Sequence, residues 1–161
     1  YGLSNIHGEE FKEVEPFSGK FASCQNEYSL VTRDNENDLL VNCNDLQLTP
    51  MTWGSLGQGV LTGKYNINSG FGVNDRRSRD IYTNFHGEKL RRNVEIVESM
   101  KPLAEKLGVS LASLAVRFIL DHIPDSVALV GDKNPGQIEG TMTSMDFRLS
   151  KDELKFLENM V

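Results

Sequence analysis

The residues best suited to chemistry lie in one stretch, Pro50 to Tyr65, where an aromatic side chain, a glycine-rich segment and a lysine follow one another. Trp53 ends a short apolar run that predicts a buried strand, and four of the next ten residues are glycines. A glycine-rich turn exposes backbone N–H groups that can hold an anion such as phosphate, and Lys64 adds a positive charge. The stretch therefore indicates a ligand with a flat ring and a phosphate; a turn that only links a strand to a helix is the alternative.

The surrounding chain alternates between short apolar runs and amphipathic segments, which predicts strands between helices. The predicted strands cover residues 1–5, 21–25, 48–53 and 126–130. The predicted helices cover residues 7–15, 35–46, 93–107, 111–122, 136–145 and 151–160. Asp34, Ser110 and Ser150 are the expected N-caps, and Gly108 ends one helix. Residues 54–85 form a long polar loop of the kind that often carries function.

Apolar strands that alternate with helices are typical of a parallel sheet with helices packed outside it. Four such units are present, whereas a closed eight-stranded barrel needs about 250 residues, and this chain has 161. We therefore predict an α/β fold in which parallel βα units form half of a TIM barrel, or a truncated one. Residues 1–161 are expected to form a single domain.

Charge and cysteine content exclude several classes of protein. The net charge of −6 argues against a nucleic-acid binder and against a protein that binds anionic membranes. Cys24 and Cys43 are far apart and form no metal-binding or disulfide pattern, and Cys24 is expected to be a buried thiol. No signal peptide and no apolar run of about 20 residues is visible. These features predict a cytoplasmic protein without a metal site.

Polar side chains follow each predicted strand at its carboxyl end, where parallel barrels build their sites. They are Ser4, Asn5, Gln25, Trp53, Ser55, Leu56, Lys64, Gly131, Lys133 and Gln137. Serine, asparagine and glutamine can hold a carboxamide through both donors and acceptors, and an indole can stack on a flat heterocycle. Lys133 stands at a predicted helix start and can meet a phosphate. The set suits a nicotinamide nucleotide.

These segments resemble the aldo-keto reductase family, including its relatives, the potassium-channel beta subunits. The resemblance rests on Gly-Leu-Ser-Asn at 2–5, Gln-Asn-Glu-Tyr-Ser-Leu at 25–30, the glycine stretch, Asp75-Arg-Arg77, Phe85 and Val-Gly-Asp-Lys-Asn-Pro-Gly-Gln at 130–137. It covers the C-terminal half of the family only. It implies that Ser4, Asn5 and Gln25 hold the nicotinamide carboxamide and that Trp53 stacks on the ring. It also implies that Lys64 meets the pyrophosphate and Lys133 the 2′-phosphate of NADP.

The chain also departs from the family pattern. Family members reduce carbonyls by hydride transfer, with a tyrosine proton donor aided by lysine, aspartate and often histidine. Those residues lie on the family's first four strands, and no residue here matches them, so we assign no catalytic residue. Gly54-Ser55 replaces a Ser-Pro pair, and Gly140-Thr141 replaces an adenine-binding Glu-Asn pair. Both changes are expected to weaken NADP binding.

Two hypotheses remain open. In the first, the chain is the half of an NADP-dependent aldo-keto reductase that binds the cofactor, and it is catalytically incomplete on its own. In the second, it is a non-catalytic half-barrel that binds a nucleotide or a protein partner. In either case two copies could pair, because a four-stranded sheet leaves two open edges. His7, His86 and His122 have no neighbour in the sequence that would make one of them a general base.

Overall fold

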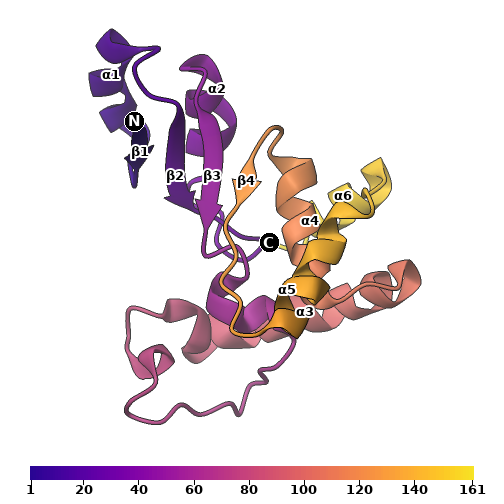
Figure 1. The fold of residues 1–161 in the computed structure, drawn as a ribbon. Coiled ribbons are helices and arrows are strands. Elements are labelled where there is room, and N and C mark those ends of the chain that lie inside the picture. The colour runs from indigo at the N-terminus through magenta and orange to yellow at the C-terminus, as the bar shows by residue number, and fades with distance from the viewer.

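In the computed structural model, which describes residues 1–161, four strands form one parallel sheet in the order β1-β2-β3-β4 (Figure 1). The strands are β1 (Gly2–Ser4), β2 (Ser23–Glu27), β3 (Thr49–Trp53) and β4 (Val127–Ala128). The α-helices are α1 (Phe11–Val14), α2 (Cys43–Asp45), α3 (Gly87–Leu107), α4 (Leu111–His122), α5 (Pro135–Met142) and α6 (Lys151–Glu158). The predicted α/β fold with a parallel sheet is confirmed.

Helices cover one face of the sheet and leave the other face exposed. In β2, Cys24 and Asn26 are fully buried, whereas the alternate residues Gln25 and Glu27 are half-buried. The same alternation runs through β3. Since successive side chains of a strand point to opposite faces, one face packs against the helices and the other lies open, and no helix crosses in front of β2 and β3 in Figure 1.

Helix α4 forms the centre of the core. Its side chains Leu114, Phe118 and Ile119 have no exposed surface, and its bounds, Leu111–His122, are those predicted. It packs against β4 and against α3, α5 and α6. The hydroxyl of Ser110 accepts a hydrogen bond from the backbone N–H of Ser113, so the predicted N-cap is also confirmed.

Several predicted strand and helix boundaries differ from the structure. Strand β2 runs on to Glu27, so Gln25 lies in its middle rather than at its end. Only two residues of the predicted strand 126–130 pair with β3, because the chain turns away after Leu129. Helix α3 begins at Gly87, six residues before the predicted start, and α5 ends at Met142, followed by a 3-10 turn at Thr143–Met145.

The predicted helix 35–46 differs from the structure in geometry and in its cap. Its centre is a π-helical turn at Asp38–Asn42 that leads into α2, and Asp34 caps nothing. The side-chain amide of Asn35 instead donates to the carbonyl of Glu27 at 2.8 Å, which ties the start of the segment to the end of β2. A tertiary contact has therefore replaced the local cap.

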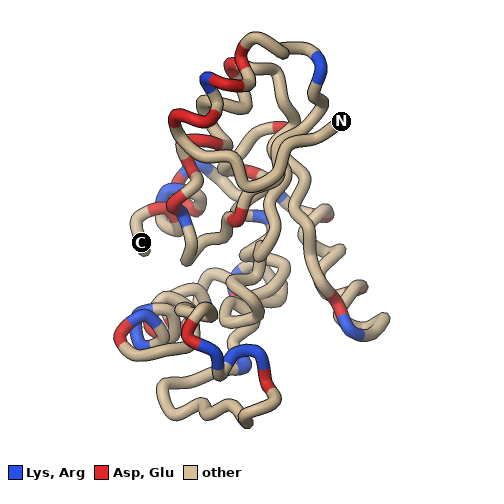
Figure 2. The backbone as a smooth tube through the Cα atoms, turned by 90° about the vertical axis from the view of Figure 1, so that its left-hand side faces the viewer, with Lys and Arg blue, Asp and Glu red and all other residues tan.

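Charged residues of both signs are interspersed along the chain (Figure 2). In the long loop the basic residues Arg76, Arg77 and Arg79 stand between Asp75 and Asp80, so they form no broad positive surface. Both cysteines are buried free thiols, as expected for Cys24. None of the helices combines the length and the apolar character that crossing a bilayer requires.

Candidate functional site

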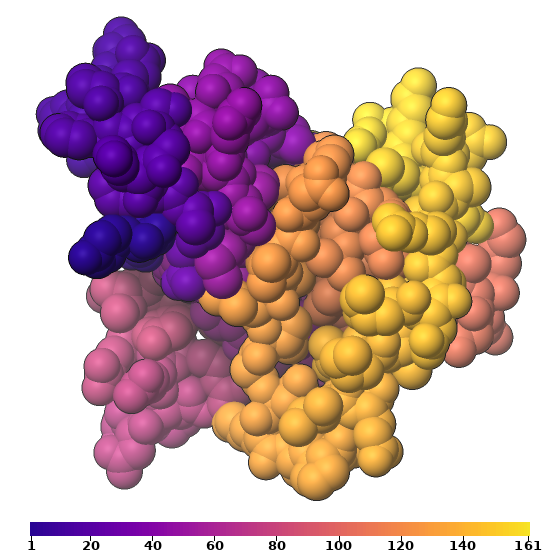
Figure 3. Space-filling model, turned by 45° about the horizontal axis from the view of Figure 1, so that its top comes forward, coloured from indigo at the N-terminus to yellow at the C-terminus, as the bar shows by residue number.

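A pocket of about 530 Å³ opens beside the carboxyl ends of β3 and β4. One wall is the glycine-rich segment, where two short 3-10 turns within Gly57–Thr62 meet at a kink at Gln58 and Gly59. The opposite wall is the segment that follows β4 together with the first turns of α5. Figure 3 shows the surface hollowed between the pink long loop and the orange segment after β4. The volume lies in the range of small-molecule and cofactor sites.

Glycine is required where the segment 54–63 approaches its neighbours. A Cβ atom on Gly63 would lie 2.6 Å from the side chain of Leu111, and one on Gly57 would lie 2.9 Å from those of Val31 and Val60. Both glycines also have positive φ angles, 76° and 56°, which favour glycine. The glycine pattern in the sequence therefore serves the close packing of this wall as well as its exposed backbone.

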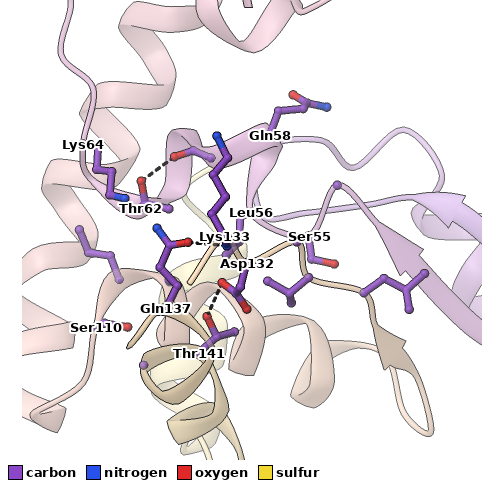
Figure 4. A pocket seen from close by; sticks show the side chains of 18 of the residues that line it. Ser55, Leu56, Gln58, Thr62, Lys64, Ser110, Asp132, Lys133, Gln137 and Thr141 are labelled. Atoms are coloured by element: carbon purple, nitrogen blue, oxygen red, sulfur yellow. Dashed lines mark hydrogen bonds between the residues drawn. The ribbon is translucent and has the colours of Figure 1, made fainter. Parts of the chain in front are cut away.

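The pocket contains two lysines that take no part in the ion pairs of the chain, Lys64 and Lys133. Figure 4 shows Lys64 on the glycine-loop side and Lys133 on the side that follows β4. The third cation on the lining, Arg77, is already paired with Asp75. Two ammonium groups outside any ion pair, on facing walls, favour an anionic ligand between them.

Arg77 is held by aromatic rings as well as by Asp75. Its guanidinium carbon lies 5.1 Å from the ring centre of Tyr65, 4.9 Å from that of Phe71 and 5.9 Å from that of Phe85. Cation–π attraction at such distances stabilises the contact. The long loop is therefore closed on itself next to the pocket.

The remaining predicted residues lie at the rim formed by β1, β2 and β3. Ser4 pairs in register with Gln25, and the backbone N–H of Asn5 donates to the carbonyl of Gln25 at 2.9 Å. The indole N–H of Trp53 donates to the side-chain carbonyl of Asn5 at 3.1 Å. Trp53 precedes Gly54, the first residue of the pocket lining. Asn5, Gln25 and Trp53 thus lie together at one edge of the sheet.

A buried polar chain fastens the glycine loop to this rim. The amide of Gln58 donates to the carboxylate of Glu27, and the amide of Asn84 donates to Gln58 at 2.6 Å. Asn93 in turn donates to the backbone carbonyl of Asn84 at 3.1 Å. Glu27 is the register partner of Trp53. Burial raises the pKa of Glu27, although the hydrogen bond from Gln58 opposes that shift.

The structure divides the predicted site residues into two adjacent groups. Those on the pocket lining are Ser55, Leu56, Lys64, Gly131, Lys133 and Gln137. Those at the rim beside it are Ser4, Asn5, Gln25 and Trp53. Ser55 is almost fully buried, and its hydroxyl lies 3.0 Å from that of Thr52, so this side chain is largely occupied within the protein.

Several lining residues were not predicted from the sequence as site residues. They include Gln58, Thr62, Arg77, Ser110 and Asp132. Ser110 was expected only as a helix cap, and Asp132 stands inside the quoted 130–137 segment. No sequence pattern other than the surrounding glycines marks Gln58 and Thr62 as pocket residues.

None of the three histidines lines the pocket. His7 lies 3.5 Å from Asp38, and His86 contacts the backbone carbonyl of Arg79 at 3.1 Å. His122 is half-buried and stacks on Phe118, with ring centres 5.1 Å apart. The histidines therefore offer no general base at this site.

Comparison with known proteins places this arrangement in a family. The model of the aldo/keto reductase family matches residues 1–161, the whole chain. The chain belongs to the aldo/keto reductase family. The aldo-keto reductase YhdN of Bacillus subtilis is 31% identical over 99% of this chain and 49% of its own length. A probable voltage-gated potassium channel subunit beta of Arabidopsis thaliana is 32% identical over 76% of this chain and 38% of its own length.

Solved aldo/keto reductase structures show the same fold. The glycerol dehydrogenase AKR11B4 from Gluconobacter oxydans superposes with a TM-score of 0.86 at 30% identity, over 99% of this chain and 47% of its own. An aldo/keto reductase from Klebsiella pneumoniae, in complex with NADP and acetate, superposes with a TM-score of 0.69 at 22% identity, over the same shares. This chain therefore spans about half the length of these relatives, and the predicted half of a TIM barrel is confirmed.

Proposed function

We propose that this chain is the nicotinamide-dinucleotide-binding half of an aldo/keto reductase, an oxidoreductase that reduces carbonyls. One observation carries the proposal. The rim with the Trp53 ring and the Asn5 amide lies directly beside a pocket that contains two lysines outside any ion pair. Residues 1–161 act as one domain in this proposal, which is supported by a single core cluster that runs from Phe11 to Leu157.

The residues present fit such a cofactor. Asn5 and Gln25 offer amide groups to the carboxamide, and Trp53 offers its ring to the nicotinamide. Lys64 would meet the pyrophosphate, and Lys133 would meet a 2′-phosphate if the cofactor is NADP. When bound, the dinucleotide supplies the hydride. No residue of this chain is assigned to proton transfer, so we expect it to bind the cofactor without completing catalysis.

The test is a titration of the purified chain with NADPH and with NADH. Trp53 is the only tryptophan, and its position at the rim makes its fluorescence a direct reporter. We expect both nucleotides to quench it, because each would stack on the ring. No quenching by either nucleotide at millimolar concentration, together with no heat of binding in calorimetry, would remove the proposal.

Charge-removing variants identify the phosphate contacts. Lys64→Gln and Lys133→Gln should each weaken NADPH binding about tenfold, because a hydrogen bond to a charged group contributes about 1.5–3 kcal/mol. Lys20→Gln is the matched control, since Lys20 is exposed and precedes β2 at the opposite edge of the sheet. Equal losses in all three variants would indicate general electrostatics rather than a site.

The open face of the sheet favours a second candidate function, a non-catalytic interaction module that pairs with another half-barrel. Parallel sheets are almost always covered on both faces. On this face the side chains of β2 and β3 are only half-buried, and no helix crosses in front of them in Figure 1. A chain that forms a defined dimer but binds neither dinucleotide would support this candidate over the first.

A further inference from the structure

We propose that Asp132 makes this site select the dinucleotide that lacks the 2′-phosphate, NAD(H), over NADP(H). The inference rests on the proposed function and names the form of the cofactor that the site takes. It depends on the position of one carboxylate within the pocket and on how the donors around it are used.

Asp132 follows β4 and is half-buried in the pocket wall. The hydroxyl of Thr141 donates to its Oδ1 atom at 3.4 Å, while its Oδ2 atom has no hydrogen-bond partner within the chain. Figure 4 shows the carboxylate next to Thr141. One oxygen is thus anchored and the other is free to accept a hydrogen bond from a ligand.

Asp132 is the only acidic residue on the pocket lining. With Arg77 neutralised by Asp75, the free charges of the site are Lys64, Lys133 and Asp132. In the proposed function Lys64 meets the pyrophosphate, and Lys133 stands next to Asp132 in the chain. A further phosphate, with a charge of about −1.5 to −2 at pH 7, would have to share Lys133 with the neighbouring carboxylate. Like charges in one partly buried site repel strongly.

Part of the backbone donors at the start of α5 is already used, so they offset that repulsion only in part. The N–H of Lys133 already donates to the side chain of Gln137 at 2.7 Å, and the N–H of Gln137 donates to Asn134 at 3.1 Å. Pro135 has no N–H. A phosphate placed here would therefore have the Lys133 side chain and the N–H groups of Asn134 and Gly136 as donors, with the Asp132 carboxylate beside them.

Asp132 disfavours a phosphate but favours the diol of an unphosphorylated ribose. The hydroxyl groups of the diol are donors, and an ionised carboxylate only accepts hydrogen bonds. In doubly-wound dinucleotide-binding folds, an acidic side chain binds the ribose 2′-hydroxyl of NAD in this way. The free Oδ2 of Asp132 supplies such an acceptor, so the same atom that repels a phosphate attracts the hydroxyl.

The experiment compares NADH and NADPH binding to the full chain, by Trp53 fluorescence and by calorimetry, for wild type, Asp132→Asn and Asp132→Ala. We expect wild type to bind NADH more tightly. Both variants should bind NADPH about tenfold more tightly than wild type, while NADH binding changes less and in the unfavourable direction. Asp146→Asn is the matched control, because Asp146 is exposed and outside the pocket lining. Circular dichroism checks the fold of each variant.

The outcomes separate this inference from the proposed function. If neither nucleotide binds to wild type or to either variant, the proposed function fails and the inference with it. If both bind but wild type prefers NADPH, or if the NADH to NADPH ratio is the same in wild type and both variants, the role of Asp132 is overturned while the binding function stands.

Discussion

Trp53 is held by Asn5, in the turn that follows β1. Its indole N–H donates to the side chain of Asn5, which leaves the amide NH₂ group of Asn5 free for a ligand. Asn5 has a φ angle of 54°, a conformation that asparagine adopts more readily than most residues. The identity of residue 5 therefore serves both the backbone turn after β1 and the orientation of the ring.

Glu27 gives the molecule a testable pH dependence. Its pKa is raised, chiefly by burial, so the folded state binds the proton more tightly than the unfolded chain. The stability that this provides is present below the unfolded pKa and is lost as the pH rises through the folded pKa. We predict that Glu27→Gln raises the melting temperature at pH 7, because glutamine keeps an acceptor for Gln58 without the buried charge.

The measurement is thermal unfolding from about pH 4 to pH 8. The stabilisation of Glu27→Gln relative to wild type should shrink toward the acidic end of the range, where Glu27 itself is protonated. Glu13→Gln, on the exposed side of α1, is the control and should show no such trend. A Glu27→Gln variant that melts lower than wild type at every pH would show that the charge itself stabilises the loop.

At the scale of elements, α6 depends on its first turn. The hydroxyl of Ser150 accepts from the N–H of Glu153 at 3.3 Å, and the carboxylate of Glu153 accepts from the N–H of Ser150 at 2.9 Å. Lys106 on α3 also donates to that carboxylate, at 2.8 Å. These contacts, the one from Lys106 first, lower the pKa of Glu153 to about 2.

We predict that Ser150→Ala lowers the free energy of unfolding by about 0.5–2 kcal/mol, the usual cost of losing an N-cap. Denaturant titration at pH 7 measures it. Because the pKa of Glu153 is depressed in the folded state, its contribution is present above the unfolded pKa and lost as the pH falls toward 2. Ser99→Ala, an exposed serine within α3, should cost much less; equal costs would contradict the capping role.

The elements that could be predicted from sequence are those whose ends have a local chemical cause. Ser110 and Ser150 begin α4 and α6, and Gly108 ends α3 with a φ angle of 66°. The π-helical turn at Asp38–Asn42 and the two-residue β4 have no such cause, since contacts with β2 and β3 determine them. Local patterns cannot contain that information.

The candidate site was predictable to a similar degree. Residues at strand ends, such as Trp53 and Lys133, follow from the rule that parallel sheets gather their sites at one edge. Arg77 could not be placed, because its position depends on three rings at 65, 71 and 85 that close an irregular loop. Asp132 is part of the segment 130–137, which carries the family resemblance, but its proposed role in cofactor selection could be inferred only from its position on the pocket lining.

For the whole molecule, the open sheet face leads to a prediction about assembly. Val127 of β4 is 42% exposed and is the register partner of Met51. We predict that the isolated chain pairs with a second copy through this face and the free edges, because apolar surface and unpaired strand edges favour association. Light scattering should then give twice the chain mass of 18.0 kDa.

Val127→Lys should return the protein to a monomer, because it places a charge on the contact surface. The matched control is Val41→Lys, whose residue is 45% exposed but lies on the helical side of the sheet; it should remain a dimer. A well-folded wild-type monomer at every concentration would contradict the prediction and would leave the face to a different partner.

The strand order β1-β2-β3-β4 also bears on how the protein is made. Each strand pairs with the strand synthesised just before it, so no gap in the sheet is left for a later segment to fill. A nascent chain that has released residues 1–53 from the ribosome already contains β1, β2 and β3 with all of their mutual partners. The sheet can therefore grow at one edge in step with translation, as domains commonly do.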